Sequence, residues 1–321
     1  MSIPLQSELQ YFSLANNSFS GSIPISFCNA INLLILDMSR NKLSGSIPPC
    51  LLENISDLDL SRNNISGYIP DTFPVLCGLS YLDLNNNALE GKIPKSTGSC
   101  VFLEHMNIGN SMINDTFPCM LTSLLAVLVL HSNRFHGDLR CHGNWQNLKI
   151  LDVPSNHFCG SLESIDFSSL TAMVRSSGGD FEGGFGHKLD VTLIMKGRMM
   201  EFHKILSDFS TIDLSSNSFY GEIPNAIGDL TSLHQINFSH NALNESIPKS
   251  FGQLKNLESL DLSVNQLTGW IPEELGGLTF LSKLISPTIS LLERSQKGSK
   301  FKHSQQIHLK EILGYVVSLS T

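Results

Sequence analysis

Histidine and cysteine gather in one stretch of the 321-residue sequence, where they could serve as metal ligands. The six residues are His131, His136, Cys141, His142, His157 and Cys159. Structural zinc sites usually contribute close pairs such as Cys-x-x-Cys, and many catalytic sites use His-Glu-x-x-His. Neither spacing occurs in this stretch. We therefore predict surface and loop side chains and no metal ligands.

Regularly spaced carboxylates suggest an acid or metal site at first sight. They are Asp37, Asp59, Asp83, Asp152, Asp213 and Asp261. Identical residues at one phase of a repeat are typical of a scaffold, so we interpret them as solvated positions without a chemical role. No nucleophile stands at a family spacing from a base, and no paired carboxylates define a cleft. The sequence therefore predicts no catalytic residue, no cofactor and no enzyme.

A glycine-rich run, RSSGGDFEGGFGHKLD at 175–190, matches two ligand-binding loops only in part. The Gly-Lys-Ser/Thr ending of a phosphate-binding loop is absent. A calcium-binding Gly-Gly-x-Gly-x-Asp nonapeptide needs aspartate where Lys188 stands. We predict a polar loop.

One repeated pattern must position all of these residues. Its template, from Leu33 to Pro48, is Leu-x-x-Leu-x-Met-x-x-Asn-x-Leu-x-Gly-x-Ile-Pro, and ten copies recur every 22 to 24 residues, with one longer gap between Asn156 and Asn217. The alternating Leu-x-Leu segment is typical of a short strand, and stacked strands form a parallel sheet. The asparagine turns inward to satisfy backbone groups, and Ile-Pro begins the return on the convex side. The pattern predicts an α/β repeat solenoid with a parallel concave β-sheet.

Ligand binding on such a scaffold should use the sheet positions that vary. The position before the second strand leucine carries aromatic and β-branched side chains, which we predict to form an exposed patch. Ordinary strand propensity accounts for these residues equally well. The candidate ligand surface comprises Tyr11, Ile35, Tyr81, His105, Val127 and Ile150.

Seven cysteines leave at least one without a partner in the chain. Residues that share a repeat phase lie about 5 Å apart on neighbouring turns, within the Cα range of a disulfide. By this criterion Cys28 can pair with Cys50, and Cys119 with Cys141, although small buried thiols remain the open alternative. We interpret the others as core thiols, namely Cys77, Cys100 and Cys159.

Six Asn-x-Ser/Thr sequons offer sites for glycosylation. Asn237 falls within a concave strand, where a glycan would obstruct binding, so its use is doubtful. The candidate glycosylation sites are Asn16, Asn54, Asn64, Asn114 and Asn244.

The composition narrows the classes of partner. Only 16% of the residues are charged, and the formal net charge is −8, which argues against nucleic acid as the main partner. No apolar stretch is long enough to span a membrane, and the first residues have no basic segment followed by an apolar one, as a signal peptide would.

The repeat resembles the plant extracellular leucine-rich-repeat class. Two further segments, LEHMNIGNSMINDTFPCM at 103–120 and the stretch from Val191 to Pro224, look like the receptor-like proteins of plants, which lack a kinase domain. The resemblance implies a glycosylated superhelical ectodomain at the extracellular face of the plasma membrane, with one non-repeat island. It also implies recognition of a peptide, protein or glycan, and pairing with a receptor-kinase co-receptor in defence or developmental signalling.

The resemblance divides the chain into four parts. Residues 5–162 form a first block of repeats, 163–206 the island, and 207–284 the last block. Repeats begin almost at Met1 without a cysteine-containing cap, and residues 285–321 abandon the pattern. Re-reading this tail in another frame can restore a family-like ending, so we hypothesise a frameshift and a truncated ectodomain.

There are two alternatives to a receptor fragment. One is a soluble inhibitor-type binding module, and the other is a truncated gene product without function. The island favours the receptor, because short inhibitors of that kind usually form an uninterrupted solenoid.

Overall fold

The computed structural model describes residues 8–141, 145–174, 191–195, 198–202 and 209–286. The chain forms two compact units. The first comprises residues 1–148 and 153–157, and the second comprises residues 149–152 and 158–321.

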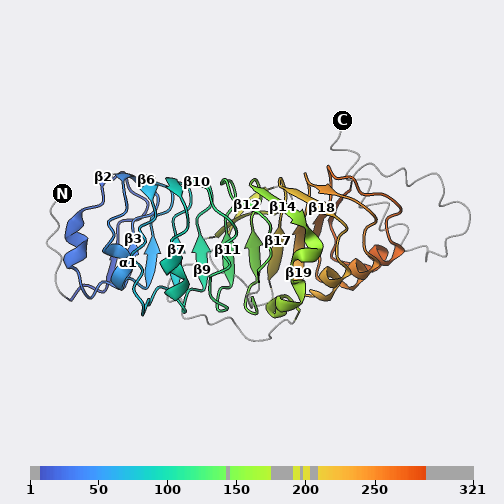
Figure 1. The fold of residues 1–321 in the computed structure, drawn as a ribbon, viewed down its shortest axis with the longest axis horizontal. Helices are drawn as coiled ribbons and strands as arrows, with labels where there is room; N and C mark the ends of the chain where they lie inside the picture. Colours follow the sequence, from blue (N-terminus) through green and yellow to red (C-terminus); the bar gives the residue numbers. More distant parts are fainter. Residues whose placement is uncertain (1–7, 142–144, 175–190, 196–197, 203–208, 287–321) are drawn as a thin grey trace, which may run out of the picture. The chain divides into compact units, whose positions relative to one another are not determined.

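A parallel sheet of Leu-x-Leu segments runs through the first unit (Figure 1). The middle residue of each strand points into the core, and Leu36, Leu58 and Leu82 are each 0% exposed. Side chains alternate between the two faces of the sheet with period 2, although all three residues of β7, β9 and β11 are buried. In order, the strands are β1 (Tyr11–Ser13), β3 (Ile35–Asp37), β5 (Asp57–Asp59), β7 (Tyr81–Asp83), β9 (His105–Asn107) and β11 (Val127–Val129).

Short strands and helices make up the return leg of each repeat in this unit. A second parallel sheet contains β2 (Ser20–Ser22), β4 (Lys42–Gly45), β6 (Asn64–Tyr68), β8 (Ala88–Gly91) and β10 (Met112–Ile113), and β12 spans His136–Gly137. The helices are the 3₁₀ helices η1 (Ile25–Asn29) and η2 (Lys95–Ser99) and the single-turn α1 (Leu51–Asn54). Pro24 and Pro94 cap the two 3₁₀ helices, where a missing N–H costs no hydrogen bond.

The second unit repeats this construction. Its parallel sheet contains β13 (Ile150–Asp152), β17 (Ser210–Asp213), β19 (Leu233–Asn237), β21 (Ser259–Asp261) and β22 (Lys283–Ile285). Beside it lie β14 (His157–Ser161), β18 (Ser218–Gly221) and β20 (Ala242–Leu243). The 3₁₀ helices are η3 (Leu162–Ser164), η4 (Phe167–Ser169), η5 (Thr171–Met173), η6 (Asn225–Asp229), η7 (Lys249–Gln253) and η8 (Glu273–Gly277).

The non-repeat insertion leaves the sheet of the second unit intact. Ile150 of β13 pairs directly with Thr211 of β17. The return leg before the insertion also keeps repeat register, since the Ser232 N–H donates to the Met173 carbonyl at 2.8 Å. The expectation that the island at 163–206 also interrupts the parallel sheet is therefore wrong. The insertion contains an antiparallel hairpin of β15 (Val191–Met195) and β16 (Arg198–Phe202), and the glycine-rich loop expected at 175–190 lies outside the described residues.

An asparagine ladder ties most repeats to the one before, and Ser111 takes the place of asparagine in the repeat of β9. The Asn87 amide donates to the Leu60 carbonyl at 3.0 Å and to the Leu84 carbonyl of its own repeat at 3.0 Å, while its oxygen accepts the Ile65 N–H at 3.0 Å. One side chain thus satisfies three backbone groups that the turns leave open. The ladder consists of Asn41, Asn63, Asn87, Asn133, Asn156, Asn217, Asn241 and Asn265.

A residue in the left-handed conformation precedes every asparagine of the ladder and turns the chain inward. Its φ lies between 52° and 56° at Arg40, Arg62, Asn86, Ser132, Ser155, Ser216, His240 and Val264. Asparagine tolerates this conformation well, whereas a β-branched residue such as Val264 is rarely found in it.

Three disulfides staple neighbouring repeats of the first unit. Cys28–Cys50 and Cys119–Cys141 are the pairs that repeat phase indicates, with Cα–Cα distances of 5.4 Å each. The expectation of core thiols at Cys77 and Cys100 is wrong, because these residues form a disulfide with a Cα–Cα distance of 4.5 Å. Their phases differ by one residue, yet the turns still bring them within bonding range.

The last strand of the sheet includes Leu284, the residue at which the predicted last block of repeats ends. Strand β22 ends at Ile285 and pairs with β21, so the stack takes in one more strand than the ten complete copies. Residues 287–321, which include most of the aberrant tail, lie outside the described residues. The solenoid of leucine-rich repeats with a parallel sheet is confirmed.

We expect Asn87→Ala and Asn241→Ala each to lower the free energy of unfolding by about 1–3 kcal/mol, because buried backbone groups lose their partners. Urea unfolding of the variants measures this loss. The control is Asn64→Ala, at an exposed asparagine of β6 outside the ladder, which should stay within roughly 0.5 kcal/mol. Equal losses at Asn64 and Asn87 would contradict the structural role of the ladder.

Candidate ligand-binding face and flanking groove

The varying positions of the sheet form one column in each unit, as the repeat phase predicts. In the first unit the paired residues along the column are Tyr11, Ile35, Asp57, Tyr81, His105 and Val127. In the second unit they are Ile150, Thr211, Gln235, Ser259 and Lys283. Parallel pairing brings side chains of one phase next to each other, so each column is a continuous row on its sheet.

Exposure along the column does not follow the prediction. Tyr11 is 50% exposed and Ile35 half-buried, whereas Tyr81, His105, Val127 and Ile150 are all buried. An exposed patch over these last four residues is therefore wrong. Their aromatic and β-branched side chains gain from leaving water, so ordinary strand propensity is the better account of them.

The rings of Tyr81 and His105 pack against each other and are both buried. Their rings stack with centroids 4.3 Å apart and planes 11° apart. Burial lowers the pKa of His105 to about 3, because the imidazolium would lose its hydration. Neither ring nitrogen of His105 has a hydrogen-bond partner among the described residues. The histidine is therefore a neutral packing element of the sheet face at physiological pH.

The aspartate column closes the turns that follow the strands. In the first unit, Asp83 accepts the Asn85 N–H at 2.9 Å and the Asn107 amide at 3.1 Å, and it is 2% exposed. Such a side-chain bond to the backbone two residues onward is an Asx turn. The interpretation as a solvated position is wrong for the buried Asp83, Asp152 and Asp213. Sequence periodicity could not distinguish a repeated surface residue from a repeated turn residue.

Two buried carboxyls meet in the same column of the second unit. Asp152 and Asp213 are register partners, and Asp213 accepts the Ser215 N–H at 2.9 Å and the Asn237 amide at 2.9 Å. Desolvation, and then the charge of Asp152, raise the pKa of Asp213 to about 7. Asn237 and, in the first unit, Asn107 occupy the same strand position without a charge.

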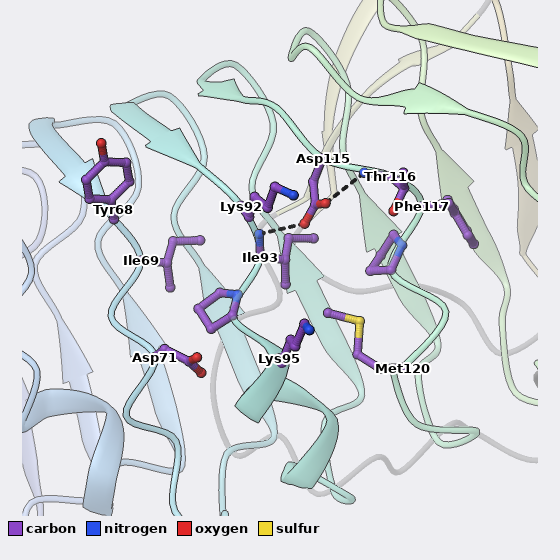
Figure 2. Close-up of a pocket in the computed structure, with 12 residues that line it drawn as sticks. Tyr68, Ile69, Asp71, Lys92, Ile93, Lys95, Asp115, Thr116, Phe117 and Met120 are labelled. Atoms are coloured by element: carbon purple, nitrogen blue, oxygen red, sulfur yellow. Dashed lines mark hydrogen bonds between the residues drawn. The ribbon is translucent and has the colours of Figure 1, made fainter.

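A groove that we did not predict lies on the flank of the first unit, where the Ile-Pro steps of three repeats adjoin (Figure 2). It encloses about 560 Å³, and Tyr68, Lys92, Lys95, Asp115 and Met120 are among the residues that line it. One sequence signal pointed to it. Asp115 stands where the repeat template has glycine.

The described histidines and cysteines of the 131–159 stretch lie at separate positions of the repeats. Among the residues that the structure describes, no group of three or more His, Cys, Asp or Glu could bind an ion. His131 instead contacts the Asn110 amide at 3.0 Å. Cys159, expected to be a core thiol, is exposed and unpaired, and His142 lies outside the described residues.

Sequon accessibility varies along the chain. Asn16, Asn54, Asn64 and Asn114 are exposed, and Asn244 is half-buried. Asn237 instead donates to Asp213 and accepts from Ser239, so its side chain is committed within the sheet. Glycosylation at the five candidate sites stays a prediction. No helix among the described residues has the length and hydropathy of a membrane span.

Models of known protein families match the repeats of this chain. Leucine-rich-repeat models match residues 8–30, 32–53, 54–76 and 78–100, and a further one matches residues 209–267. Receptor-like protein 18 of Arabidopsis thaliana is 40% identical over 71% of this chain and 26% of its own length. Receptor-like protein 32 of the same plant is 39% identical over 73% of this chain and 28% of its own length. The chain thus spans about a quarter of these relatives.

Solved structures with the same fold include plant receptor ectodomains. The ectodomain of the receptor kinase GASSHO1/SCHENGEN3 from Arabidopsis thaliana, in complex with CASPARIAN STRIP INTEGRITY FACTOR 2, matches with a TM-score of 0.66 and 27% identity over 88% of this chain and 33% of that one. The Arabidopsis receptor kinase HAESA, in complex with the peptide hormone IDA and the co-receptor SERK1, matches with a TM-score of 0.55 and 25% identity over 85% of this chain and 49% of that one.

We expect Asp213→Asn to flatten the dependence of stability on pH. A carboxyl whose pKa is raised to about 7 in the folded state binds its proton more tightly there than in the unfolded chain. The contribution of this carboxyl to stability therefore falls as the pH rises from about 4 to about 7, and asparagine removes that fall. Urea unfolding at pH 4.5, 6.0 and 7.5 should show the variant about 1–3 kcal/mol more stable than the wild type at pH 7.5.

The exposed Asp229 provides the matched control for this experiment. Asp229→Asn should keep the pH profile of the wild type. If Asp213→Asn keeps it as well, the buried carboxyl pair does not govern the profile.

The buried ring pair should contribute to stability. We expect Tyr81→Ala combined with His105→Ala to lower the free energy of unfolding by about 3 kcal/mol or more, because two buried rings leave a cavity. Tyr220, which is 55% exposed in β18, serves as a control, and Tyr220→Ala should cost little. Thermal unfolding of the three proteins measures the difference. A double variant that melts with the wild type would show that the rings are dispensable for packing.

Proposed function

Because the chain belongs to the leucine-rich-repeat receptor-like proteins of plants, we propose that it is part of the ectodomain through which such a receptor recognises an extracellular ligand. The ligand is a peptide, protein or glycan, and signalling proceeds through a receptor-kinase co-receptor in defence or development. The proposed location is the extracellular face of the plasma membrane. No enzymatic activity is part of this proposal.

One observation carries the proposal: a constant scaffold presents a varying row of side chains. The core leucines and the ladder asparagines have their partners inside the repeats, while the column on the sheet face changes residue type from strand to strand. Such a surface can change its partner without any change in fold. The resemblance to ectodomains bound to a peptide hormone, as in the HAESA complex, supports a ligand on this type of scaffold.

The first strands of the sheet are the part of this face best suited to contact a ligand. Tyr11 is exposed, and Ile35, Asp37 and Asp57 of the next two strands are half-buried. An exposed tyrosine beside an isoleucine offers the amphipathic area that dominates many interfaces. Tyr81 and His105, in contrast, support the sheet from a buried position.

The proposed function is tested with the secreted chain, immobilised and screened against pools of synthetic peptides and cell-wall oligosaccharides. We expect a pool component to bind, and Tyr11→Ala combined with Ile35→Ala to weaken it about tenfold or more, as loss of an interface anchor does. The control is again Tyr220→Ala. Melting temperatures of all proteins should agree within a few degrees.

Two results would count against the proposal. The first is an absence of binding to every pool by the folded chain. The second is a set of binders whose affinity is the same for the wild type and the Tyr11/Ile35 variant, since the sheet face would then not be the recognition surface.

A further inference from the structure

The flanking groove is a product of the repeat itself. Its floor is formed by Ile69, Ile93 and Phe117, which occupy the same Ile-Pro step in three successive repeats and are 4%, 3% and 8% exposed. Pro94 and Pro118 line it beside them. Proline has no N–H, so this floor is apolar and offers few hydrogen-bond donors.

Two larger side chains form parts of the rim. Tyr68, 66% exposed, lies with its ring over Gly91, where a Cβ atom would approach the ring to 2.3 Å. The absence of a side chain at Gly91 therefore leaves the space that the Tyr68 ring occupies. Met120 lies toward the other side of the groove and is 36% exposed (Figure 2). An aromatic ring and a thioether at an apolar floor are suited to an aliphatic or aromatic ligand side chain.

The carboxylates of the groove are engaged by the protein. Asp115 accepts the Ile93 N–H at 3.1 Å and the Thr116 N–H at 2.9 Å, as Figure 2 shows. Asp71 accepts the Ser96 hydroxyl and the Ser96 N–H, and these bonds lower the pKa of Asp71. Both acidic groups thus stabilise neighbouring backbone, which leaves fewer of their lone pairs for a ligand.

The lysine side chains of the groove, unlike its two carboxylates, are not held by hydrogen bonds to described residues. Lys92 lies between Tyr68 and Asp115, and Lys95 lies at the opposite end near Asp71 (Figure 2). Both lysines are exposed, and neither makes an ion pair or a hydrogen bond through its side chain with a described residue, while the charge of Lys95 adds to the lowering of the Asp71 pKa. The groove therefore presents a donor group at each end of an apolar floor.

We propose that this groove binds an extended peptide segment of a partner protein, in which an apolar side chain is flanked by carboxylates. The apolar side chain lies on the floor beside Tyr68 and Met120, and the two carboxylates meet Lys92 and Lys95. The charge pattern favours an acidic peptide over a basic one. The proposal depends on the proposed function in one respect, namely that the ligand comes from outside the chain. The site itself is separate from the sheet face.

The experiment uses the full chain and two synthetic peptides of equal length. The probe is acetyl-Gly-Asp-Leu-Phe-Asp-Gly-amide, and its partner has asparagine in place of both aspartates. We expect fluorescence anisotropy to show the acidic peptide binding about tenfold more tightly than the neutral one at low salt, with the difference reduced at high salt. Lys92→Gln combined with Lys95→Gln should abolish the preference.

Three controls make the result specific. Lys42→Gln removes an exposed lysine of β4 that does not line the groove, and it should leave the preference intact. Gly91→Ala should displace the tyrosine ring and weaken both peptides. Asn114→Gln removes the sequon beside the groove, and peptide binding should be the same with and without it.

Other outcomes overturn the proposal. Equal affinity of the wild type for both peptides, no binding by either, or a preference for the acidic peptide that survives in the Lys92/Lys95 variant would each exclude an acidic-peptide site. Binding only after Asn114→Gln would show that a glycan occupies the groove instead. None of these results would affect recognition at the sheet face, because Tyr11 and Ile35 lie outside the groove.

Discussion

Each asparagine of the ladder bonds to backbone groups of two neighbouring turns, and the other features follow from this arrangement. In the second unit, the Asn241 oxygen accepts the Phe219 N–H at 3.0 Å while its amide donates to the Leu214 carbonyl at 3.0 Å. A repeat held in this way cannot slide along its neighbour. Constant register then aligns the sheet columns, brings cysteines of adjacent turns within bonding distance, and places the Ile-Pro steps side by side.

Interactions that recur in every repeat could be predicted from the sequence. The strands, the inward leucines, the asparagines and the disulfide between Cys28 and Cys50 all depend on position within the repeat, which spacing reveals directly. The Cys77–Cys100 disulfide escaped prediction because one extra residue shifts the phase without moving the Cα atoms out of range. Its detection needed coordinates.

Properties that depend on what surrounds a residue were harder to predict. Spacing shows that Tyr81 and His105 share a phase, but their burial depends on the neighbours that each ring meets. The burial of Asp83 was hard to predict for the same reason, because its position recurs in every repeat while the residues around it differ. The groove combines residues from six positions of the repeat, so no single column of the sequence indicates it. Only Asp115, which stands where the template has glycine, indicated the location of the groove in the sequence.

Val264 shows that equivalent repeats need not be equally stable. It adopts the left-handed conformation, with φ at 52°, that Asn86 and Ser216 adopt in other repeats. For a β-branched residue this conformation costs roughly 1–2 kcal/mol, which the ladder bonds of Asn265 must offset. Local opening therefore requires less free energy at this turn than at one built on asparagine. In a stack of repeats that contact only their neighbours, a backbone angle at one turn can therefore make one repeat open more readily than another with the same hydrophobic core.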